Sequence, residues 1–273
     1  MNDRQLLEHY AISPKRSLGQ NFLHDRNMLE KIVALAELQP GETALEIGPG
    51  TGNLTRVLAQ SAERVVAVEL DDRLLPLLDT EFGTQDNVRV VHADILTTQV
   101  SELVTPPFVV VANVPYYITS AILRHLLENT PRPRRLVLTV QREVATRLVA
   151  QPGDMSILAV SVQFYSTPHI AMNINPGAFW PRPEVASAVV CLDVHTDPFP
   201  GVADVDLFFR VVRAGFGQKR KQLRNALSAG LGLAKSQVDE LLAGGGIDGQ
   251  RRAETLALAE WAALTQAVAQ AGL

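Results

Sequence analysis

The chain has 273 residues, 47% of them apolar and 20% charged, which predicts one large or two unequal globular domains. The single cysteine, Cys191, excludes an internal disulfide, and no cysteine–histidine cluster has the spacing of a zinc site. A net charge of −4 argues mildly against a protein that coats nucleic acid uniformly, so positive charge matters here only where it is concentrated.

Helix-like and strand-like segments alternate through the first half of the chain. Amphipathic spacing predicts helices at 28–38, 53–62, 71–82 and 119–129. Runs rich in β-branched residues predict strands at 43–47, 64–70, 88–94, 108–113 and 135–141. Because parallel neighbours need a crossover connection, this alternation predicts a mostly parallel, Rossmann-like α/β sheet with helices on both faces.

The later part of the chain changes character twice. Strands are predicted at 157–165 and 187–194, separated only by a Pro-rich loop, and they are expected to form an antiparallel edge of the sheet. Beyond Val194 a linker-like stretch leads into an Ala- and Leu-rich helical pattern. The sequence therefore predicts a catalytic domain over residues 1–197 and a small all-α domain over residues 198–273.

A glycine-rich loop follows the first predicted strand. Gly48, Gly50 and Gly52 form a G-x-G-x-G pattern after Glu46, at the strand end where open α/β sheets bind ligands. A dinucleotide loop would need a glycine where Asn53 stands, and no Gly-Lys-Ser/Thr follows for a triphosphate. The loop fits a nucleoside without a pyrophosphate, and it resembles the S-adenosylmethionine (SAM) loop of class I methyltransferases.

Acidic residues end the next two strands. Glu69 lies 17 residues beyond Gly52, where its carboxylate can accept hydrogen bonds from both ribose hydroxyls, and Asp94 could accept one from the adenine amine. Taken singly, a glycine loop can be a tight turn and a terminal acid a solvated cap. Together, the glycine loop after one strand and the acidic residues at the ends of the next two strands favour a nucleoside site.

The fourth strand ends in the sequence Asn113-Val114-Pro115-Tyr116. Methyl transfer to a planar exocyclic amine is difficult because the nitrogen lone pair is delocalised into the ring. The Asn113 side-chain oxygen and the backbone carbonyl after it can accept the two N–H bonds and favour tetrahedral geometry. Pro115 constrains the turn, and Tyr116 offers a face on which an extruded base can stack.

This chemistry needs no covalent enzyme intermediate. A sulfonium donor is already activated, so the displacement needs neither a metal nor a nucleophilic side chain. Attack through C5 of a pyrimidine would need a cysteine, whereas Cys191 lies inside a predicted strand and is expected to be a core residue.

With these residues in place, the chain resembles the KsgA-type ribosomal RNA adenine dimethyltransferases, which dimethylate N6 of two adjacent adenosines near the 3′ end of 16S rRNA. The similarity covers nearly the whole chain, and its motifs occur in the family order: KRSLGQNFL, EIGPGTGNLT, VELDD, HADIL, NVPYYIT, QREVATRL, AFWPRPEVASAVV, GFGQKRKQLRNAL and RAETLALAEWAAL. The series, including its C-terminal motifs, is specific to this family.

The resemblance implies roles for individual residues. The implied SAM contacts are Asn21, Leu23, Gly48, Glu69, Asp94 and Asn113, with Asn21 and Leu23 closing over the cofactor. The target site would comprise Asn113, Pro115 and Tyr116, with Phe179 covering the other face of the adenine. No metal site is implied.

Two departures from the family pattern are visible. Val114 stands where these enzymes usually carry Leu, a small apolar exchange that leaves the backbone carbonyl in place. The stretch PGDMSIL lacks the Lys and Tyr that the family often has there, which removes support for an RNA contact at this point.

Positive charge is concentrated near the start of the second predicted domain. No acid interrupts the six cations of this stretch, which are Arg210, Arg213, Lys219, Arg220, Lys221 and Arg224. The alternative is a solvated helix face opposite Phe208, Phe209 and Val212, but the family resemblance favours phosphate contacts by Arg213, Lys219, Arg220, Lys221 and Arg224. Lys15 and Arg16 offer a second basic site if this one fails.

The expected partner is the small ribosomal subunit with its 16S rRNA. The N-terminus has no apolar signal region and no stretch has the length of a membrane span, so a monomeric cytoplasmic protein without a membrane partner is expected. Three other functions stay open at this point. They are a 23S rRNA adenine methyltransferase of the antibiotic-resistance type, a ribosome-assembly factor without catalysis and, more weakly, a DNA adenine methyltransferase.

Overall fold

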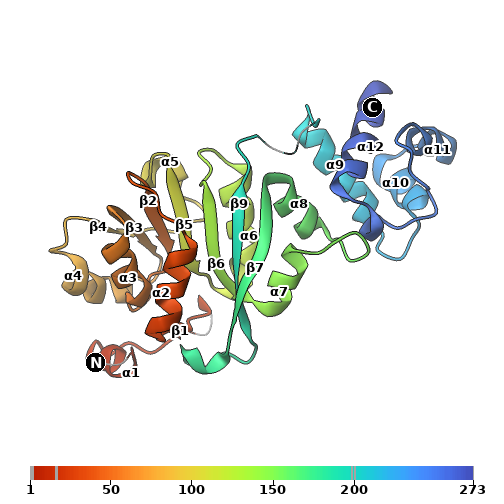
Figure 1. The fold of residues 1–273 in the computed structure, drawn as a ribbon. Coiled ribbons are helices and arrows are strands. Elements are labelled where there is room, and N and C mark those ends of the chain that lie inside the picture. Colours follow the sequence, from red (N-terminus) through yellow and green to blue (C-terminus); the bar gives the residue numbers. More distant parts are fainter. Residues whose placement is uncertain (1–2, 16–17, 198, 200, 273) are drawn as a thin grey trace. The chain divides into compact units, whose positions relative to one another are not determined.

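The computed structural model describes residues 3–15, 18–197, 199 and 201–272, which fold into two compact units (Figure 1). Unit 1 comprises the chain up to Ala145 together with Thr167–Val194, and unit 2 comprises Thr146–Ser166 together with the chain from His195 onward. Arg16, Ser17 and the first residue of the predicted second domain, at position 198, lie outside the described residues.

A seven-stranded sheet forms the centre of unit 1 (Figure 1). Its strands, in spatial order, are β4 (Val88–His92), β3 (Arg64–Glu69), β2 (Thr43–Ile47), β5 (Phe108–Asn113), β6 (Arg135–Gln141), β9 (Ser187–Val194) and β7 (Ser166–Ile174). The pairs β3–β4, β2–β3, β2–β5 and β5–β6 are parallel, and β9 runs antiparallel to β6. The prediction of a mostly parallel sheet with an antiparallel edge is confirmed.

Helices precede, connect and follow the parallel strands. They are α1 (Asp3–His9), α2 (Arg26–Leu35), α3 (Asn53–Ser61), α4 (Leu75–Phe82), α5 (Val100–Leu103) and α6 (Thr119–Glu128), followed by α7 (Arg142–Leu148). A separate two-stranded ladder pairs β1 (Phe22–Leu23) with β8 (Phe179–Trp180), so that Leu23 lies opposite Phe179. Neither this ladder nor α1 is among the predicted elements.

Both faces of the sheet are buried at its inner strands, such as β2, β3 and β5. Ala44 and Val65 belong to one core cluster that also contains Leu29 of α2 and Leu58 of α3. Side chains alternate across a strand, so the next residue, Leu45, faces the opposite side, and it is also fully buried. Burial on both faces explains why these strands are nearly continuous apolar runs in the sequence.

The strand predicted at 157–165 is wrong, because this segment is the helix α8 (Ile157–Tyr165). The segment is apolar except for Ser161 and Gln163, and so short an apolar segment has no clear period that separates a buried strand from a buried helix. The signal that distinguishes them is Ser156, whose hydroxyl accepts a hydrogen bond from the Ala159 amide at 3.2 Å and caps the helix. The edge strand is instead the next segment, β7, which follows α8 directly.

Among the described residues, the secondary structure of unit 2 is helical apart from Ser166, the first residue of β7. Besides α8 it contains α9 (Val205–Phe216), α10 (Leu223–Leu231), α11 (Lys235–Gly244) and α12 (Leu258–Gln270). Phe164 of α8 packs against Phe208 of α9, with ring centroids 4.6 Å apart, and Trp261 of α12 is completely buried. The segment 146–166, assigned to the first domain by the predicted boundary, therefore groups with the C-terminal helices through its aromatic core.

Candidate active site and basic surface

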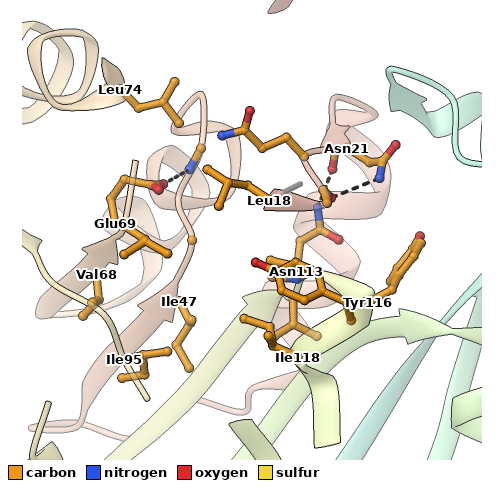
Figure 2. Close-up of a pocket in the computed structure, with 18 of the residues that line it drawn as sticks. Leu18, Asn21, Ile47, Val68, Glu69, Leu74, Ile95, Asn113, Tyr116 and Ile118 are labelled. Atoms are coloured by element: carbon orange, nitrogen blue, oxygen red, sulfur yellow. Dashed lines mark hydrogen bonds between the residues drawn. The ribbon is translucent and has the colours of Figure 1, made fainter. Parts of the chain in front are cut away.

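One edge of the sheet in unit 1 is hollowed into an open pocket of about 810 Å³. Most of its lining comes from five stretches of chain: Leu18–Phe22, the three ends of β2, β3 and β4, and the loop from Asn113 to Ile118. In Figure 2, Glu69, Val68 and Ile95 lie on one side of the pocket and Asn113 and Ile118 lie on the other, with Ile47 between them. Parallel strands end at the same edge, so residues far apart in the sequence meet here.

Glu69 is buried and held in place by backbone donors. Its Oε2 accepts a hydrogen bond from the Gly50 amide at 3.0 Å (Figure 2), and its Oε1 accepts one from the Asp71 amide at 2.8 Å. Burial raises the pKa of Glu69, and these two hydrogen bonds oppose the rise. Each carboxylate oxygen still has a lone pair for a further donor.

Asp94 also lines the pocket, in the loop after β4. Its Oδ1 accepts a hydrogen bond from the Leu96 amide at 2.9 Å, which orients the carboxylate within the turn. The structure therefore brings Glu69 and Asp94 to one cavity, as the strand-end pattern predicts.

The three glycines of the loop have different roles. A Cβ at Gly50 would lie 2.8 Å from Phe22, and one at Gly52 would lie 2.6 Å from Phe82, so both positions are required for packing. Gly48 has a φ of +70°, and a Cβ there would meet nothing within 4 Å. Gly48 is thus the position at which the loop backbone is open to a ligand.

Glu46, just before this loop, is a buried acid without a partner. It is 1% exposed, and neither of its carboxylate oxygens has a hydrogen-bond partner within the described chain. Burial raises its pKa to about 8, and the nearby Thr55 hydroxyl offsets only part of this rise. Glu46 lines a smaller cavity of about 300 Å³ that shares Gly48 and Asn113 with the main pocket. An unpaired buried carboxyl group beside a pocket is suited to receive a cation.

Asn113 is oriented by the N-terminal segment. Its Nδ2 donates a hydrogen bond to the Asn21 carbonyl at 2.8 Å (Figure 2). A carbonyl can only accept, so the nitrogen of the Asn113 amide faces Asn21 and Oδ1 remains as an acceptor for another donor. Asn21 in turn is held by a hydrogen bond from its own Nδ2 to the Gly19 carbonyl at 3.1 Å.

Two tyrosines follow Asn113 in the pocket wall. The Tyr116 hydroxyl lies 2.6 Å from Oγ of Ser187, a buried residue at the start of β9, and this contact tethers the far end of the ring. Partial burial raises the pKa of Tyr116, so the hydroxyl stays protonated. Tyr117 is 59% exposed at the rim. Sequence reasoning missed both Ser187 and Tyr117, although the second tyrosine of the NVPYY motif was visible.

Two predicted site residues lie in the core rather than in the main pocket. Phe179 is 3% exposed and packs in the same core cluster as Leu23, Leu29 and Ile174. It pairs with Leu23 in the β1–β8 ladder, which directs both side chains into the interior. The structure therefore does not bring Phe179 to the pocket, and Leu23 contributes only to the smaller cavity.

The basic residues of unit 2 divide into free and paired cations. Lys219, Arg220 and Lys221 are exposed in the turn between α9 and α10. Arg210 and Arg213 border a groove of about 670 Å³ between these two helices. The helices cross closely because Ala214 and Gly230, at the crossing point, are small. These five side chains are placed where solvent and a partner can reach them.

Arg224, which is predicted to contact phosphate, differs from these neighbours because it has an acidic partner, although its side chain is still 41% exposed. Its Nη2 donates to the Asp239 carboxylate at 2.5 Å, and its Nε is buried. Arg251 of the RAETL motif is similarly paired with Glu260 and donates to the Thr255 carbonyl at 2.6 Å. Both arginines connect segments of unit 2, and nothing in the spacing of charges along the sequence separates them from the free cations.

Within the described residues, no helix is long and apolar enough to cross a membrane. No group of three or more His, Cys, Asp and Glu side chains in the same part of the chain could hold a metal ion. Cys191 is buried in β9, and burial raises the pKa of its thiol to about 11.

The sheet order, the glycine loop and the acids at successive strand ends define a class I SAM-dependent methyltransferase. The family model described as "Ribosomal RNA adenine dimethylase" matches residues 12–270. The chain belongs to this family.

Relatives agree with this assignment. The proteins named "Ribosomal RNA small subunit methyltransferase A" from Dehalococcoides mccartyi strain CBDB1 and Moorella thermoacetica strain ATCC 39073 are 46% and 45% identical to the chain. The first alignment covers 94% of this chain and 89% of the relative, and the second covers 96% and 94%.

Two solved structures extend the likeness to the fold. A dimethyladenosine transferase from Plasmodium falciparum is 25% identical with a TM-score of 0.79, over 92% of this chain and 98% of that one. The 23S rRNA methyltransferase ErmE is 30% identical with a TM-score of 0.74, over 92% and 100%.

Proposed function

We propose that this enzyme transfers methyl groups from SAM to N6 of two adjacent adenosines near the 3′ end of 16S rRNA, during biogenesis of the small ribosomal subunit. The observation that carries the proposal is the 46% identity to a relative named for the small subunit, over 94% of the chain. That alignment is too long to be confined to unit 1, so the likeness includes the unit expected to select the substrate.

The pocket residues fit SAM in shape and charge. Gly48 leaves open space beside the loop, Glu69 and Asp94 offer carboxylate acceptors for ribose hydroxyls and an adenine amine, and apolar side chains lie between them. Glu46 is a buried carboxyl group with no hydrogen-bond partner among the described residues, and the ammonium group of the methionyl end would favour its ionised form. Asn21 and Asn113 complete the cavity wall, whereas Leu23 supports it from the core.

Bound SAM supplies a methyl group that is attached to a positively charged sulfur. Transfer of the methyl group leaves this sulfur as a neutral thioether. The chain therefore has to present the acceptor nitrogen in the right geometry. The free Oδ1 of Asn113 and the carbonyl of Val114 would accept the two N–H bonds of the adenine amine, which favours a tetrahedral nitrogen. Pro115 shapes the turn, and the tethered ring of Tyr116 offers a stacking face for the base.

Unit 2 is proposed to bind RNA through its free cations. Lys219, Arg220, Lys221 and Arg213 are exposed and are suited to phosphate contacts, which position an RNA without reading its sequence. Arg224 supports the unit through Asp239 instead. Residues 1–197 and 198–273 thus retain their proposed roles in catalysis and substrate recognition, with 146–166 packed in the second unit.

We further propose that the enzyme acts as a cytoplasmic monomer and without a metal. The support for the last point is chemical, since a sulfonium donor needs no Lewis acid to make its leaving group depart. A second candidate, methylation of 23S rRNA, has one observation in its favour, namely the fold shared with ErmE at 30% identity.

The direct test is methyl transfer in vitro. Purified enzyme and tritiated SAM would be incubated with undermethylated small subunits, with large subunits and with naked 16S rRNA. We expect label in 16S rRNA from the small subunits and none in 23S rRNA. Label confined to 23S rRNA would establish the second candidate, and binding of SAM and RNA without transfer would indicate an assembly factor.

A further inference from the structure

A buried carboxylate just beyond β3 is engaged by the N-terminal part of the chain. Asp71 accepts a hydrogen bond from Gln20 Nε2 at 2.7 Å and is paired with Arg73, whose Nε lies 2.8 Å and whose Nη2 lies 2.5 Å from its carboxylate oxygens. Hydrogen bonds from Arg73 and Gln20 hold the pKa of Asp71 at about 2 despite its burial. Asp71 is therefore ionised at neutral pH, and its hydrogen bond to Gln20 is charge-assisted.

Gln20 is held at both ends of its side-chain amide. While Nε2 donates to Asp71, Oε1 accepts a hydrogen bond from the Lys15 amide at 2.7 Å. Arg73 adds a third link, because its Nη1 donates to the Ser13 carbonyl at 3.1 Å. The end of β3 thus fixes the chain that leads into the pocket wall.

The next residue along the chain orients the proposed acceptor. The carbonyl of Asn21 holds Nδ2 of Asn113 at 2.8 Å, and this bond leaves Oδ1 aimed away as the free acceptor. One residue before Gln20, Gly19 lies against the same loop, since a Cβ there would be 3.2 Å from Pro115. Residues 18–22, which we call the strap, therefore span the pocket from the acid side to the Asn113 side.

A purely structural role does not account for the Gln20 link. Arg73 already neutralises Asp71 through two hydrogen bonds and Lys15 Nζ lies 3.9 Å from its Oδ1, so the ionised carboxylate has cationic partners besides Gln20. The Gln20–Asp71 hydrogen bond joins residues 51 positions apart in the sequence. It fixes the chain one residue away from Asn21, whose carbonyl orients Asn113.

On this geometry we propose that Gln20, anchored by Asp71, is a positioning residue for methyl transfer: it holds the strap so that Asn21 aims the Asn113 oxygen at the target amine. The inference rests on the proposed function. It ties the side of the pocket that carries Glu69 to the side that carries Asn113, so that loosening the strap should slow the chemical step even when both substrates are saturating.

The test exchanges the amide and the carboxylate between positions 20 and 71 of the full-length enzyme. Gln20→Glu places two carboxylates together and should lower kcat by about tenfold or more, since small misplacements of a positioning group are costly. Asp71→Asn should lower kcat less. The double variant Gln20→Glu/Asp71→Asn restores a donor opposite an acceptor and should recover most of the activity. Arg4→Met, which removes only the exposed Arg4–Glu8 pair of α1, is the control and should match the wild type.

Two readouts separate positioning from other effects. Initial rates at saturating SAM and saturating undermethylated small subunits give kcat, and amide hydrogen exchange on the free enzyme reports whether residues 18–22 are loosened. We expect the single variants to be slower and to exchange faster in the strap, with both changes reversed in the double variant. Gln20→Met, which carries no charge, repeats the test if Gln20→Glu does not fold.

Several results would overturn the inference. A wild-type kcat reached at saturation would mean that the strap affects only binding, and a double variant no faster than Gln20→Glu would remove the Gln20–Asp71 link from catalysis. Unchanged exchange of the strap in all variants would show that this link does not hold the strap. If the wild type itself transferred no methyl group, the proposed function would fail, while the exchange data would still decide whether the link holds the strap.

Discussion

The pocket of unit 1 and the basic surface of unit 2 use charge in opposite ways. Glu69 lines the pocket and is buried, as is nearby Asp71, and both carboxylates are held by hydrogen bonds from other parts of the chain. The cations Lys219, Arg220 and Lys221 are exposed in a turn, where a partner can reach them. A preorganised site suits a reaction that depends on geometry, whereas an exposed cationic surface suits phosphates whose exact positions matter less.

The largest effect is expected where geometry matters most. Asn113→Ala removes the acceptor that is needed as the amine becomes tetrahedral, and kcat should fall by about a hundredfold. Tritiated methyl transfer to undermethylated small subunits measures this, with circular dichroism as a check on folding. Wild-type turnover in a folded Asn113→Ala enzyme would remove Asn113 from the mechanism.

A smaller loss is expected for the cofactor in the same pocket. Glu69→Ala removes a charged acceptor for two ribose hydroxyls, each hydrogen bond being worth roughly 1.5–3 kcal/mol, so the Kd for SAM should rise at least about tenfold. Calorimetry tests this, and Glu69→Gln, which keeps one acceptor oxygen, should lie between the two. Equal SAM affinity in Glu69→Ala would place the ribose elsewhere.

The basic surface should respond through salt dependence rather than through chemistry. Replacing Lys219, Arg220 and Lys221 with Ala should flatten the plot of log affinity against log salt by roughly 0.7–0.9 for each phosphate that is no longer bound, and it should raise KM more than it lowers kcat. Filter binding to purified small subunits over a range of KCl measures the slope.

Arg224→Ala is the matched control for that experiment. Since Arg224 is paired with Asp239, its loss should lower the Tm and leave the salt slope unchanged. A slope reduced by Arg224→Ala as strongly as by one of the exposed cations would contradict the division into free and paired charges. An unchanged slope in the triple variant would mean that the turn is merely solvated and that the RNA surface lies elsewhere.

The smallest effect concerns two buried acids around β2. Glu46 has a pKa of about 8 in the folded protein, above its ordinary value of about 4.5. Between these two pH values the carboxyl group is ionised in the unfolded chain but still protonated in the folded one. The free energy of unfolding therefore falls as the pH rises from about 4.5 to about 8. Glu42 is paired with Arg134, which lowers its pKa, so Glu42 contributes stability that is lost as the pH falls through that lowered value.

Thermal melting from pH 5 to pH 8 separates these two acids. Glu46→Gln should raise the Tm relative to the wild type at pH 8 and change it little at pH 5, whereas Glu42→Gln should lower the Tm at neutral pH. If Glu46→Gln were less stable than the wild type at pH 8, the carboxyl group would have a partner in the free enzyme.

Topology explains which parts of the site sequence reasoning can reach. Gly48, Glu69, Asp94 and Asn113 follow strands of one parallel sheet, and such strand ends must meet, so alternating periodicity is enough to bring them together. The contact between Gln20 and Asp71 cannot be predicted in this way, because a side-chain pair 51 positions apart produces no recognisable spacing in the sequence.

The other differences between sequence and structure have equally local causes. The resemblance places Phe179 on the adenine, but its pairing with Leu23 in a two-residue ladder turns it into the core. Arg224 looks like its neighbours in the sequence because its partner, Asp239, comes from another helix. The segment 157–165 looks like a strand because apolar residues occupy most of its positions, which hides the periodicity that marks a helix.

The most direct test of the central claim is the modification state of rRNA in cells that lack this gene, read by mass spectrometry. We predict that two adjacent adenosines near the 3′ end of 16S rRNA lose their N6,N6-dimethyl groups, and that the wild-type gene restores them while the Asn113→Ala gene does not. Intact dimethyladenosines in 16S rRNA of the deletion strain, or a loss confined to 23S rRNA, would contradict the account.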